Sequence, residues 1–519
     1  MIFTSPWPSV AIPDTPYSDF IFAHTSERAD KPAFIDGPTG RTLTHGQVRS
    51  AARRVAAGLA HKGLRKGDRV AIVSPNLPEY PVAFHGIALA GGVVTTANPL
   101  YRVEELAHQL DDCAARFVVT VPAFLESVRA ASSRTRVEEV FVFGEAAGAT
   151  SFAALLDNED TPPQVEIDPA NDLLVLPYSS GTTGRPKGVM ITHRNAVAML
   201  SINVPLLDDD TSRHISLAVL PYFHAYGMSN MNGCLRYGLT HVTMPRFDFE
   251  QYLSLIERYR VTALAVVPPI LLALARHPSV AQHDLSSLEY IGCGAAPLSE
   301  SVAMQASERL KVDVRQRYGM TETTVGCSGW APSEANRPGA VGRLLPNMEA
   351  RVVDPSSGEE LGANQRGELL VRGPNVMRGY LNNEAATAAT LDVDGWLHTG
   401  DIATLDDDGY LYIVDRLKEL IKVKGYQVAP AQLEAVLLQH PAIADAAVIG
   451  VPDDEAGELP KAFVVLRLPG TSAEAIIAET ARQLAPHQRI RELEFVDAIP
   501  KSPSGKILRR ELRARSATR

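Results

Sequence analysis

Apolar and polar positions alternate between a helical and a strand periodicity through the first part of the chain. Residues 44–47, Thr-His-Gly-Gln, fit a capping box at the start of a helix. The apolar residues that follow recur every three or four positions and predict one buried helical stripe, formed by Val48, Ala52, Val55 and Leu59. Gly63 stands where a glycine commonly ends a helix, and 69–73 is apolar enough for a buried strand. This alternation predicts an α/β layered domain.

The same alternation of helical and strand patterns continues from 166 to about 345. Strands are predicted at 261–267 and 288–291, and a helix at 270–276. From 346 to 416 the sequence instead shows short strand patterns and turn clusters, which predict a small β-rich subdomain.

The last part of the chain carries two separate lysine-bearing loops around an α/β pattern. We therefore predict an α/β fold with two domains. The large N-terminal domain, 1–416, consists of layered α/β subdomains plus the small β-rich subdomain. The second, 417–519, is a small mobile α+β C-terminal lid domain. Length supports this division, because 519 residues are too many for one core.

Composition excludes several classes of protein. With 45% hydrophobic and 21% charged residues, the chain is typical of a folded globular protein. A formal net charge of −10 argues against non-specific nucleic-acid or anionic-membrane binding. We expect no integral membrane association and no signal peptide, because no apolar run reaches ~18 residues and the N-terminus lacks a basic and apolar start. Four widely spaced cysteines indicate neither disulfides nor zinc, and the terminal Ser-Ala-Thr-Arg is no peroxisomal address. The expected location is cytoplasmic.

The strongest chemical signal is the stretch 178–189, which reads Tyr-Ser-Ser-Gly-Thr-Thr-Gly-Arg-Pro-Lys-Gly-Val. Hydroxyls and backbone N–H groups bind phosphate oxygens, and glycines let the backbone approach closely. The stretch is not a P-loop, because Pro186 precedes Lys187 and Gly188 follows it where Ser or Thr is needed. A polar turn between two strands is the alternative. The ordered hydroxyl–glycine–lysine pattern favours a phosphate-holding loop.

Residues 179–188 resemble the signature of the adenylate-forming superfamily, which includes acyl-CoA synthetases, adenylation domains and beetle luciferases. Further stretches narrow the resemblance to the 4-coumarate–CoA ligase-like branch, and together they cover nearly the whole chain. The resemblance implies an enzyme that uses ATP, Mg²⁺ and coenzyme A. For this loop it implies nucleotide contacts from Ser179, Ser180, Gly181, Thr182, Thr183, Gly184 and Lys187.

Residues 316–322, Gln-Arg-Tyr-Gly-Met-Thr-Glu, resemble the family's adenine and metal segment. The resemblance implies that Thr321 offers a hydroxyl to the α-phosphate and that Glu322 is a ligand of Mg²⁺, a cation that prefers carboxylate oxygens and shares itself with phosphates. An exposed Glu at a helix start is the alternative on chemistry alone. The nucleotide-binding residues implied around this segment are Gly294, Ala295, Ala296, Tyr318, Gly319 and Met320.

Two further stretches, 395–401 and 412–416, carry groups that resemble the family's ribose binders. Asp401 can accept both ribose hydroxyls because a carboxylate has two oxygens. Arg416 is implied as the second contact. From the residues alone, a structural salt bridge between Asp401 and Arg416 is the alternative.

The lid's two loops span 417–427 and 501–507. A run of lysines is normally a solvated face. Lys506, however, follows Ser-Gly and precedes a basic helix, as the family's adenylation lysine does. The resemblance places the hinge at Lys418. It also implies that the first loop alternates with Lys506 at the active site and carries Lys422, Gly425 and Gln427.

Residues 221–227 carry His224, which by residue type alone is more often a packed core histidine. The resemblance places it where the acyl group meets the incoming thiol. The implied acyl pocket is lined by Tyr226, Asn230, Ala295, Gly319, Val325 and Gly326. Tyr226 matches the residue that meets the ring hydroxyl in plant 4-coumarate ligases. The chain departs from the plant pattern in two places: it has Val325-Gly326 where that pattern has Pro-Val, and Ala295 where Gly is frequent.

The expected reaction joins a carboxylate to CoA in two steps. The carboxylate attacks the α-phosphorus of ATP and releases pyrophosphate, and the thiol then displaces AMP from the acyl adenylate. The residues implied as catalytic are Lys506, His224, Thr321, Glu322 and Lys422. A phenylpropenoate such as cinnamate or 4-coumarate is the first substrate expectation and a medium-chain fatty acid the second. The protein is expected to act as a monomer or homodimer on small molecules.

Other functions fit less of the sequence. An adenylation enzyme that loads a carrier protein with an amino acid places an Asp near His224, and 223–227 has none. A luciferase-like oxygenase shares the segments 318–324 and 424–430. A non-catalytic ATP-binding regulator would retain these residues without a reaction. A dinucleotide-binding dehydrogenase is disfavoured by Pro297 at the third fingerprint glycine, and a serine hydrolase by the absence of Gly-x-Ser-x-Gly.

Overall fold

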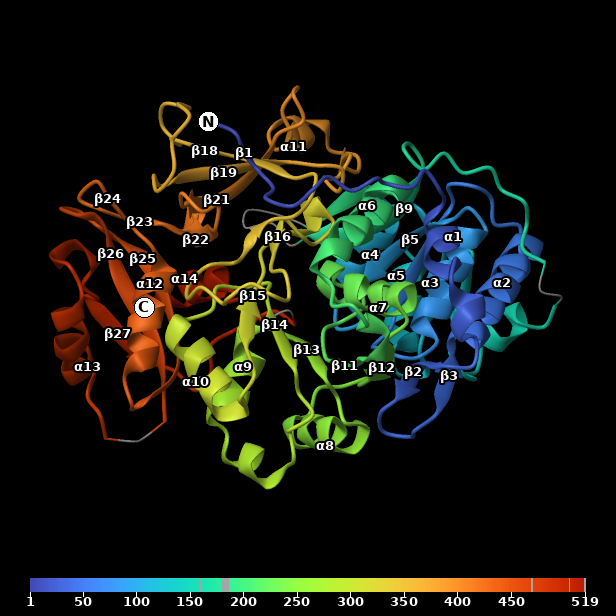
Figure 1. The fold of residues 1–519 in the computed structure, drawn as a ribbon, viewed down its shortest axis with the longest axis horizontal. Helices are drawn as coiled ribbons and strands as arrows, with labels where there is room; N and C mark the ends of the chain where they lie inside the picture. Colours follow the sequence, from blue (N-terminus) through green and yellow to red (C-terminus); the bar gives the residue numbers. More distant parts are fainter. Residues whose placement is uncertain (159–160, 180–185, 468–469, 504, 518–519) are drawn as a thin grey trace.

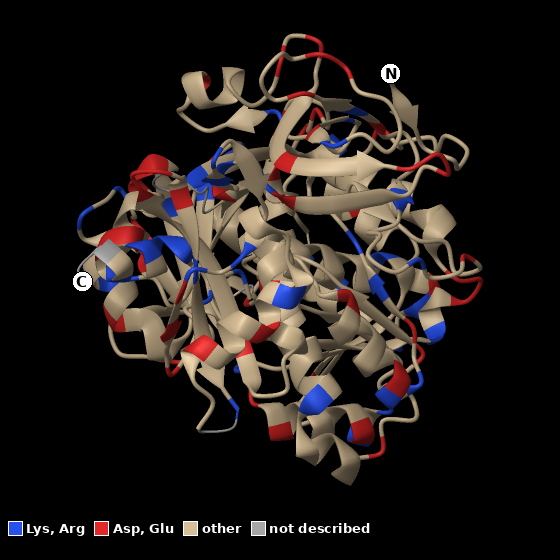
Figure 2. Ribbon diagram, turned by 90° about the vertical axis from the view of Figure 1, so that its left-hand side faces the viewer, with Lys and Arg blue, Asp and Glu red and all other residues tan. Residues whose placement is uncertain are grey.

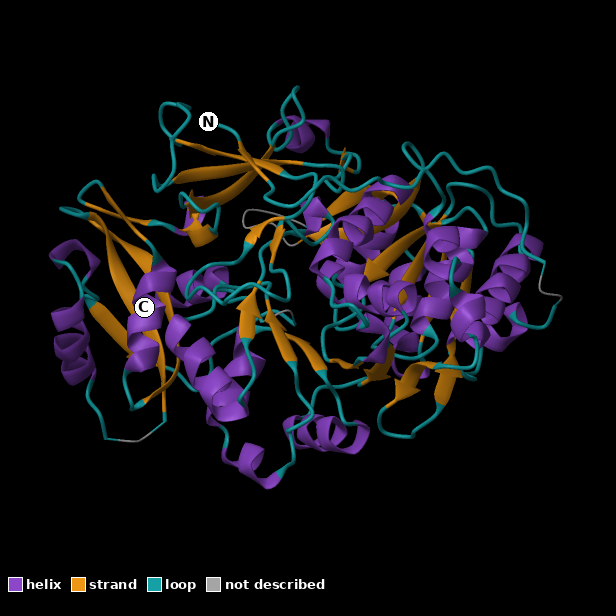
Figure 3. Ribbon diagram, in the orientation of Figure 1, coloured by secondary structure: helices purple, strands orange, loops and turns teal. Residues whose placement is uncertain are grey.

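The computed structural model describes residues 1–158, 161–179, 186–467, 470–503 and 505–517 of the chain. Two large, mostly parallel sheets, an antiparallel β-rich layer and a C-terminal lid make up a mixed α/β architecture (Figures 1 and 3). The predicted fold class, α/β with a small C-terminal domain, is confirmed.

The first sheet has eight strands and lies among the helices at the right of Figure 3. Its inner strands are nearly continuous apolar runs, as expected where helices cover both faces of a parallel sheet. In order across the sheet the strands are β20 (Gly379–Tyr380), β10 (Lys187–Thr192), β9 (Leu173–Ser179), β5 (Val93–Ala97), β4 (Arg69–Val73), β6 (Ala115–Thr120), β7 (Glu139–Val142) and β8 (Thr150–Ser151). The helices of this region are α1 (Tyr17–Phe22), α2 (His45–His61), α3 (Tyr80–Leu89), α4 (Val103–Asp112), α5 (Leu125–Ser132), α6 (His193–Asn203) and α7 (Ala225–Tyr237).

Helix α2 confirms the local prediction closely. The Thr44 hydroxyl oxygen accepts a hydrogen bond from the Gln47 N–H at 3.2 Å, and the Thr44 N–H donates to Gln47 Oε1 at 2.8 Å, which completes the capping box. The predicted apolar stripe is fully buried. Gly63 follows the helix with a φ of +83°, a conformation that glycine adopts without the steric cost of a Cβ.

The second sheet has seven strands, parallel except for the last. Its strands in order are β15 (Val314–Gln316), β14 (Tyr290–Cys293), β13 (Ala263–Val266), β11 (Ile215–Ala218), β12 (Thr240–Thr243), β2 (Pro32–Asp36) and β3 (Thr42–Thr44). Its helices are α8 (Phe249–Tyr259), α9 (Pro268–Arg276) and α10 (Glu300–Leu310). Helix α9 begins two residues earlier than predicted, because prolines are well tolerated in a first helical turn. Strand β14 lies two residues later than predicted, since Leu288 belongs to the preceding turn.

The β-rich layer at the top of Figure 1 is an antiparallel sheet of five strands. Its order is β1 (Phe3–Thr4), β18 (Glu349–Val353), β19 (Gly367–Arg372), β21 (Leu397–Leu405) and β22 (Leu411–Arg416). A two-stranded ribbon and a short helix accompany it: β16 (Ser328–Gly329), β17 (Arg343–Leu344) and α11 (Glu384–Ala388). The N-terminal strand β1 was not predicted, because a two-residue edge strand carries no periodicity.

The lid has its own sheet and its own apolar cores. Its strands are β24 (Tyr426–Val428), β23 (Ile421–Val423), β26 (Gly457–Leu466), β25 (Ile443–Asp453) and β27 (Glu492–Phe495). Its helices are α12 (Pro430–Gln439), α13 (Ala473–Thr480) and α14 (Arg509–Ala517). The buried residues of both lid cores come from 421–512 alone. The lid approaches α9, where Arg276 Nη2 donates to the Leu438 carbonyl at 3.0 Å.

Lys and Arg residues are interspersed with Asp and Glu residues along the ribbon in Figure 2, including the lid. Within the described part of the chain, no helix is both long and apolar enough to cross a bilayer. The four cysteines, Cys113, Cys234, Cys293 and Cys327, are free and buried.

Candidate active site

A cavity of about 790 Å³ lies where the second sheet, the β-rich layer and the lid meet. Residues far apart in the sequence come together on its wall. The predicted site residues that line this cavity are Ser179, Lys187, His224, Tyr226, Asn230, Gly294, Ala295, Tyr318, Gly319, Met320, Thr321, Glu322, Val325, Gly326, Arg416, Lys418 and Lys506. The volume lies within the range of small-molecule sites in proteins.

Glu322 is held firmly at the edge of this cavity. Its Oε1 accepts hydrogen bonds from Ser179 Oγ at 3.0 Å and from the Tyr380 hydroxyl at 2.8 Å. The ammonium of Lys187 lies 3.9 Å from the centre of the Tyr380 ring, a cation–π distance. The side chains of β9, β10 and β20 thus fix a carboxylate and a cation beside each other.

Asp401 and Arg416 face each other across β21 and β22. Arg416 Nε lies 3.2 Å from Asp401 Oδ1, and the Tyr318 hydroxyl donates to Asp401 Oδ2 at 2.6 Å. Burial raises the pKa of Asp401, and the nearby Arg416 and the hydrogen bond from Tyr318 oppose that shift. Arg416 lines the cavity, whereas Asp401 lies buried behind the wall. A carboxylate retains lone pairs after these two bonds, so the salt bridge and a ligand contact are compatible.

Lys506 is the lid's contribution to the cavity. Its loop is closed by hydrogen bonds with Ser502, and a methyl group placed on Gly505 would lie within 3.2 Å of Val267 and Pro269 at the start of α9. Burial, with Arg416 adding to it, lowers the pKa of Lys506 to about 8, and Asp401 acts in the opposite direction. The loop that carries Lys506 is therefore packed against the start of α9, and Lys506 lines the cavity.

His224 caps the N-terminus of α7. Its Nδ1 accepts the backbone N–H of Tyr226 at 3.3 Å, so a neutral ring carries its proton on Nε2. Burial, with a smaller contribution from Lys506, lowers the pKa of His224 to about 4. At neutral pH the side chain is therefore an uncharged hydrogen-bond donor at the cavity wall.

The turn 319–326 shapes the part of the cavity beside Tyr226. A methyl group on Gly319 would lie 1.7 Å from the Val325 carbonyl oxygen, so the close approach requires glycine. Val325 has a φ of +99°, which is rare for a β-branched residue and strains the backbone. Val325 lines the cavity, and its predicted place in the acyl pocket stays a prediction.

Some predicted residues lie elsewhere. Ala296 is off the cavity wall. Three more, Lys422, Gly425 and Gln427, are exposed on the β23–β24 hairpin of the lid. The predicted phosphate-loop residues Ser180, Gly181, Thr182, Thr183 and Gly184 lie outside the described residues.

Sequence reasoning missed several cavity residues, among them Tyr380 and Arg317. Tyr380 was missed because nothing local distinguishes it, and its position depends on the pairing of β20 with β10. Arg317 was missed although it carried a signal: it is a charged residue within a heptapeptide otherwise assigned to nucleotide binding.

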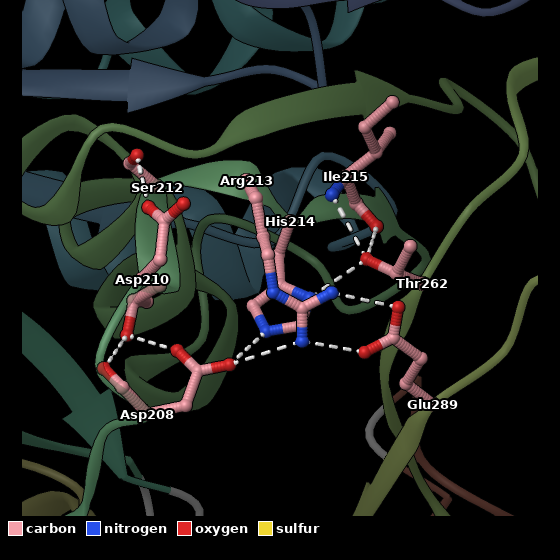
Figure 4. A network of polar contacts seen from close by, with 9 residues as sticks. Asp208, Asp210, Ser212, Arg213, His214, Ile215, Thr262 and Glu289 are labelled. Carbon is pink, nitrogen blue, oxygen red and sulfur yellow. Dashed lines mark hydrogen bonds and ion pairs between the residues drawn. The ribbon is translucent and has the colours of Figure 1, made fainter.

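The cavity also borders a network of polar contacts on the chain segments around η5 (Thr211–Arg213) and β14 (Figure 4). Arg213 lies between Asp208 and Glu289, with Nη2 at 3.4 Å and 2.6 Å from their oxygens. His214 Nε2 lies 2.6 Å from Asp208 Oδ2, and its Nδ1 lies 2.9 Å from Thr262 Oγ1. Figure 4 shows these groups turned toward one another, so they are satisfied among themselves.

Among the residues the structure describes, no group of three or more His, Cys, Asp or Glu is positioned to hold a metal. Glu322, the predicted metal ligand, presents hard carboxylate oxygens at the cavity. One protein carboxylate suits Mg²⁺ that is bound largely through substrate phosphates.

The site and fold define an AMP-forming acid–thiol ligase, and comparisons with known proteins agree. The family model described as AMP-binding enzyme matches residues 21–381, and the AMP-binding enzyme C-terminal domain model matches residues 432–506. The chain belongs to this family, and its predicted place in the 4-coumarate–CoA ligase-like branch is confirmed. It is 44% identical over 532 residues to 4-coumarate–CoA ligase 5 of Oryza sativa subsp. japonica, covering 99% of this chain and 97% of that protein.

Solved structures are similar over almost the whole chain. The anthranilate CoA ligase AuaEII in complex with anthranoyl-AMP has a TM-score of 0.90 at 28% identity, with 99% of each chain covered. ATP-bound MatB from Rhodopseudomonas palustris has a TM-score of 0.87 at 29% identity, with 96% of this chain and 99% of that chain covered. The apo form of MatB has a TM-score of 0.77.

Proposed function

We propose that the chain activates a phenylpropenoate such as 4-coumarate or cinnamate with ATP and transfers the acyl group to CoA. The names of its relatives support the substrate class. The observation that carries the proposal is the convergence of Lys506, from the lid, with Thr321 and Glu322, from the N-terminal domain, on one cavity. A site that closes over a nucleotide requires residues of the lid and of the N-terminal domain to contact the same ligand.

In the first step, a carboxylate oxygen of the acid bonds to the α-phosphorus of ATP, and the bond to the pyrophosphate oxygen breaks. Pyrophosphate leaves with the electron pair. Negative charge builds on the phosphate oxygens, so preorganised cations contribute most. Among the cations that line the cavity, Lys187, Lys506 and Arg416 are assigned to the phosphates, and the Thr321 hydroxyl would donate to the α-phosphate.

Glu322 would hold Mg²⁺ together with the phosphates, because Ser179 and Tyr380 fix its orientation through Oε1. When bound, that ion neutralises charge on the phosphates of ATP. The ribose hydroxyls are assigned to the Asp401–Arg416 pair, and the phosphate loop 180–184 completes the nucleotide site. The adenine contacts remain those predicted: Gly294, Ala295, Ala296, Tyr318, Gly319 and Met320.

In the second step, the CoA thiol gives its proton to water, its sulfur bonds to the acyl carbon, and AMP departs with the electron pair of the broken anhydride bond. His224 is a neutral donor rather than a base here, so we assign it to hydrogen bonding of the acyl oxygen. The chain's domains are proposed as 1–416 and 417–519, hinged at Lys418. Lys418 lies in η8 (Leu417–Glu419), between the last strand of the β-rich layer and the first strand of the lid. Rotation there would exchange Lys506 for the hairpin that carries Lys422, Gly425 and Gln427.

A pyrophosphate-release screen over aryl and alkyl carboxylates, with and without CoA, tests this proposal. We expect the highest kcat/KM with 4-coumarate or cinnamate, and acyl-CoA only when CoA is present. A preference for octanoate would establish a medium-chain fatty acid instead, a candidate favoured by the apolar wall formed by Leu206, Leu207 and Leu264. Absence of pyrophosphate release with every acid would refute the proposal.

We further propose a cytoplasmic protein that acts as a monomer or homodimer. Four buried free cysteines are compatible with a reducing compartment. Sedimentation at micromolar concentration distinguishes the two oligomeric states.

A further inference from the structure

Arg317 is a cavity-lining arginine with neutral partners. It follows β15, and its backbone N–H donates to the Cys293 carbonyl at 3.0 Å, which fixes it beside β14. Its Nε donates to the Tyr290 hydroxyl at 3.2 Å, and its Nη1 donates to Asn203 Oδ1 at 3.2 Å. Both acceptors are uncharged side chains, which leaves the positive charge of the guanidinium unneutralised.

Within the described residues, no Asp or Glu forms an ion pair with Arg317 and nothing accepts from its Nη2. The buried arginine of the lid shows the contrast, because Arg509 Nη2 lies 2.7 Å from Glu434 Oε1. Arg317 is partly buried and borders the cavity. Removing a cation from water is costly unless it is paired and hydrogen-bonded, so a ligand that displaces water from this part of the cavity is favoured if it brings an acceptor for the guanidinium.

Arg317 lies next to the acyl end of the cavity. The Tyr290 hydroxyl accepts its hydrogen bond, and the Tyr226 hydroxyl is near enough to interact with it electrostatically. A methyl group on Gly294 would lie 3.4 Å from the Tyr226 ring and 3.5 Å from the Arg317 carbonyl oxygen, so this glycine separates the two residues. Among the described residues the Tyr226 hydroxyl makes no hydrogen bond. An acyl group that reaches Tyr226 therefore also reaches the guanidinium.

We propose that Arg317 determines specificity by binding an acceptor oxygen at the far end of the acyl group, away from the reacting carboxylate. The oxygen is phenolic in 4-coumarate, and a second carboxylate at that position offers the same chemistry in charged form. Guanidinium N–H groups donate well to both. This inference rests on the proposed function, because it names which members of the proposed substrate class bind best.

The alternative is a purely structural role, in which Arg317 joins the end of α6 to the start of β14 through Asn203 and Tyr290. The two roles predict different kinetics. Loss of a structural bridge lowers activity with every acid alike. Loss of a distal contact raises KM only for acids that carry the distal oxygen, and it leaves kcat nearly unchanged.

The experiment measures kcat and KM by pyrophosphate release with cinnamate, 4-coumarate and 4-carboxycinnamate, which share one skeleton. Wild type, Arg317→Met, Arg317→Lys and the control Arg260→Met are compared. Arg260 is a matched control, since its guanidinium pairs with Asp284 at 2.7 Å outside the cavity. Loss of a hydrogen bond to a charged group typically costs about 10- to 100-fold in binding. We expect Arg317→Met to raise KM by that factor for the two oxygen-bearing acids and to leave cinnamate within about twofold, with partial retention in Arg317→Lys.

Equal KM values for cinnamate and the two oxygen-bearing acids in wild type would overturn the inference, and this result needs no variant to fold. A uniform loss over all three acids in a folded Arg317→Met would also overturn it, in favour of the structural role. The two oxygen-bearing acids show which kind of distal oxygen Arg317 binds. A rise in KM confined to 4-carboxycinnamate identifies a dicarboxylate site, and a rise confined to 4-coumarate identifies a phenol site. No turnover of any of the three would refute the proposed substrate class, whereas turnover without preference refutes the inference alone.

Discussion

Replacing Lys506 with alanine is expected to slow adenylate formation strongly while leaving thioester formation from a preformed adenylate largely intact. The lid places this lysine on the cavity wall with Arg416 and Lys187. The second half-reaction has no transferring phosphorus, so the ammonium is dispensable there. The substitution should therefore separate the two steps.

The magnitude follows from the number of cations that remain. Arg416 and Lys187 still face the cavity in the variant, so the loss corresponds to one preorganised contact. Such a contact is worth roughly 10²–10³ in rate, about 3–4 kcal/mol of activation free energy. Folding should not suffer. Burial lowers the pKa of Lys506 to about 8, below its ordinary value, so the charged lysine opposes the closed state at neutral pH and its removal relieves that cost.

The assay is single-turnover pyrophosphate release from ATP and 4-coumarate, run beside acyl-CoA formation from synthetic coumaroyl adenylate. Lys501→Ala serves as the control, because Lys501 lies on the same loop and pairs instead with Asp445, Nζ to Oδ2 at 2.5 Å. Pyrophosphate release at the wild-type rate in Lys506→Ala would refute the reasoning. Equal losses in both half-reactions would show that Lys506 serves lid closure rather than phosphoryl transfer.

Three further outcomes are expected. Because the pKa of Lys506 is about 8, the charged form is lost as pH rises, and kcat/KM for ATP should fall through pH 8 in wild type but stay flat in Lys506→Ala, measured as pyrophosphate release between pH 6.5 and 9.5. Tyr380→Phe keeps the ring under Lys187 but removes the 2.8 Å hydrogen bond to Glu322, so the half-saturating Mg²⁺ concentration should rise roughly 5- to 10-fold; an unchanged Mg²⁺ titration would contradict this. Gly319→Ala would put a methyl group 1.7 Å from the Val325 carbonyl, and we expect about 3 kcal/mol or more of lost stability in urea unfolding, against about 2 kcal/mol for Ala88→Gly, which removes one buried methyl group from helix α3.

The sequence could predict those features whose residues lie close together along the chain. The capping box at Thr44 and the glycine after the helix each depend on residues within a few positions of one another. The Asp401–Arg416 pair was also foreseeable, because a tight antiparallel connection aligns the two strands. Such features need no knowledge of the tertiary fold.

Contacts between distant elements could not be predicted in the same way. Tyr380 reaches Glu322 only because β20 pairs with β10, and no local pattern specifies that pairing. Arg317 is equally instructive: its charge was visible in the sequence, but the neutrality of its partners Asn203 and Tyr290 emerges only from the order of strands and helices around it. Residues 180–184, the clearest motif in the sequence, lie outside the described residues, so their nucleotide role remains a prediction.

The position of Arg416 has a consequence for how the protein handles its intermediate. It is the last residue of β22, and the next residue opens the turn that contains the proposed hinge at Lys418. A residue close to the axis of a rotation moves very little. Lys506 lies ninety residues beyond Arg416 and would move a long way when the lid rotates about the proposed hinge. The ribose of the adenylate would thus stay bound to Arg416 near the rotation axis while the lid turns to present its other face to the cavity. The activated acid would not be released to water between the two half-reactions.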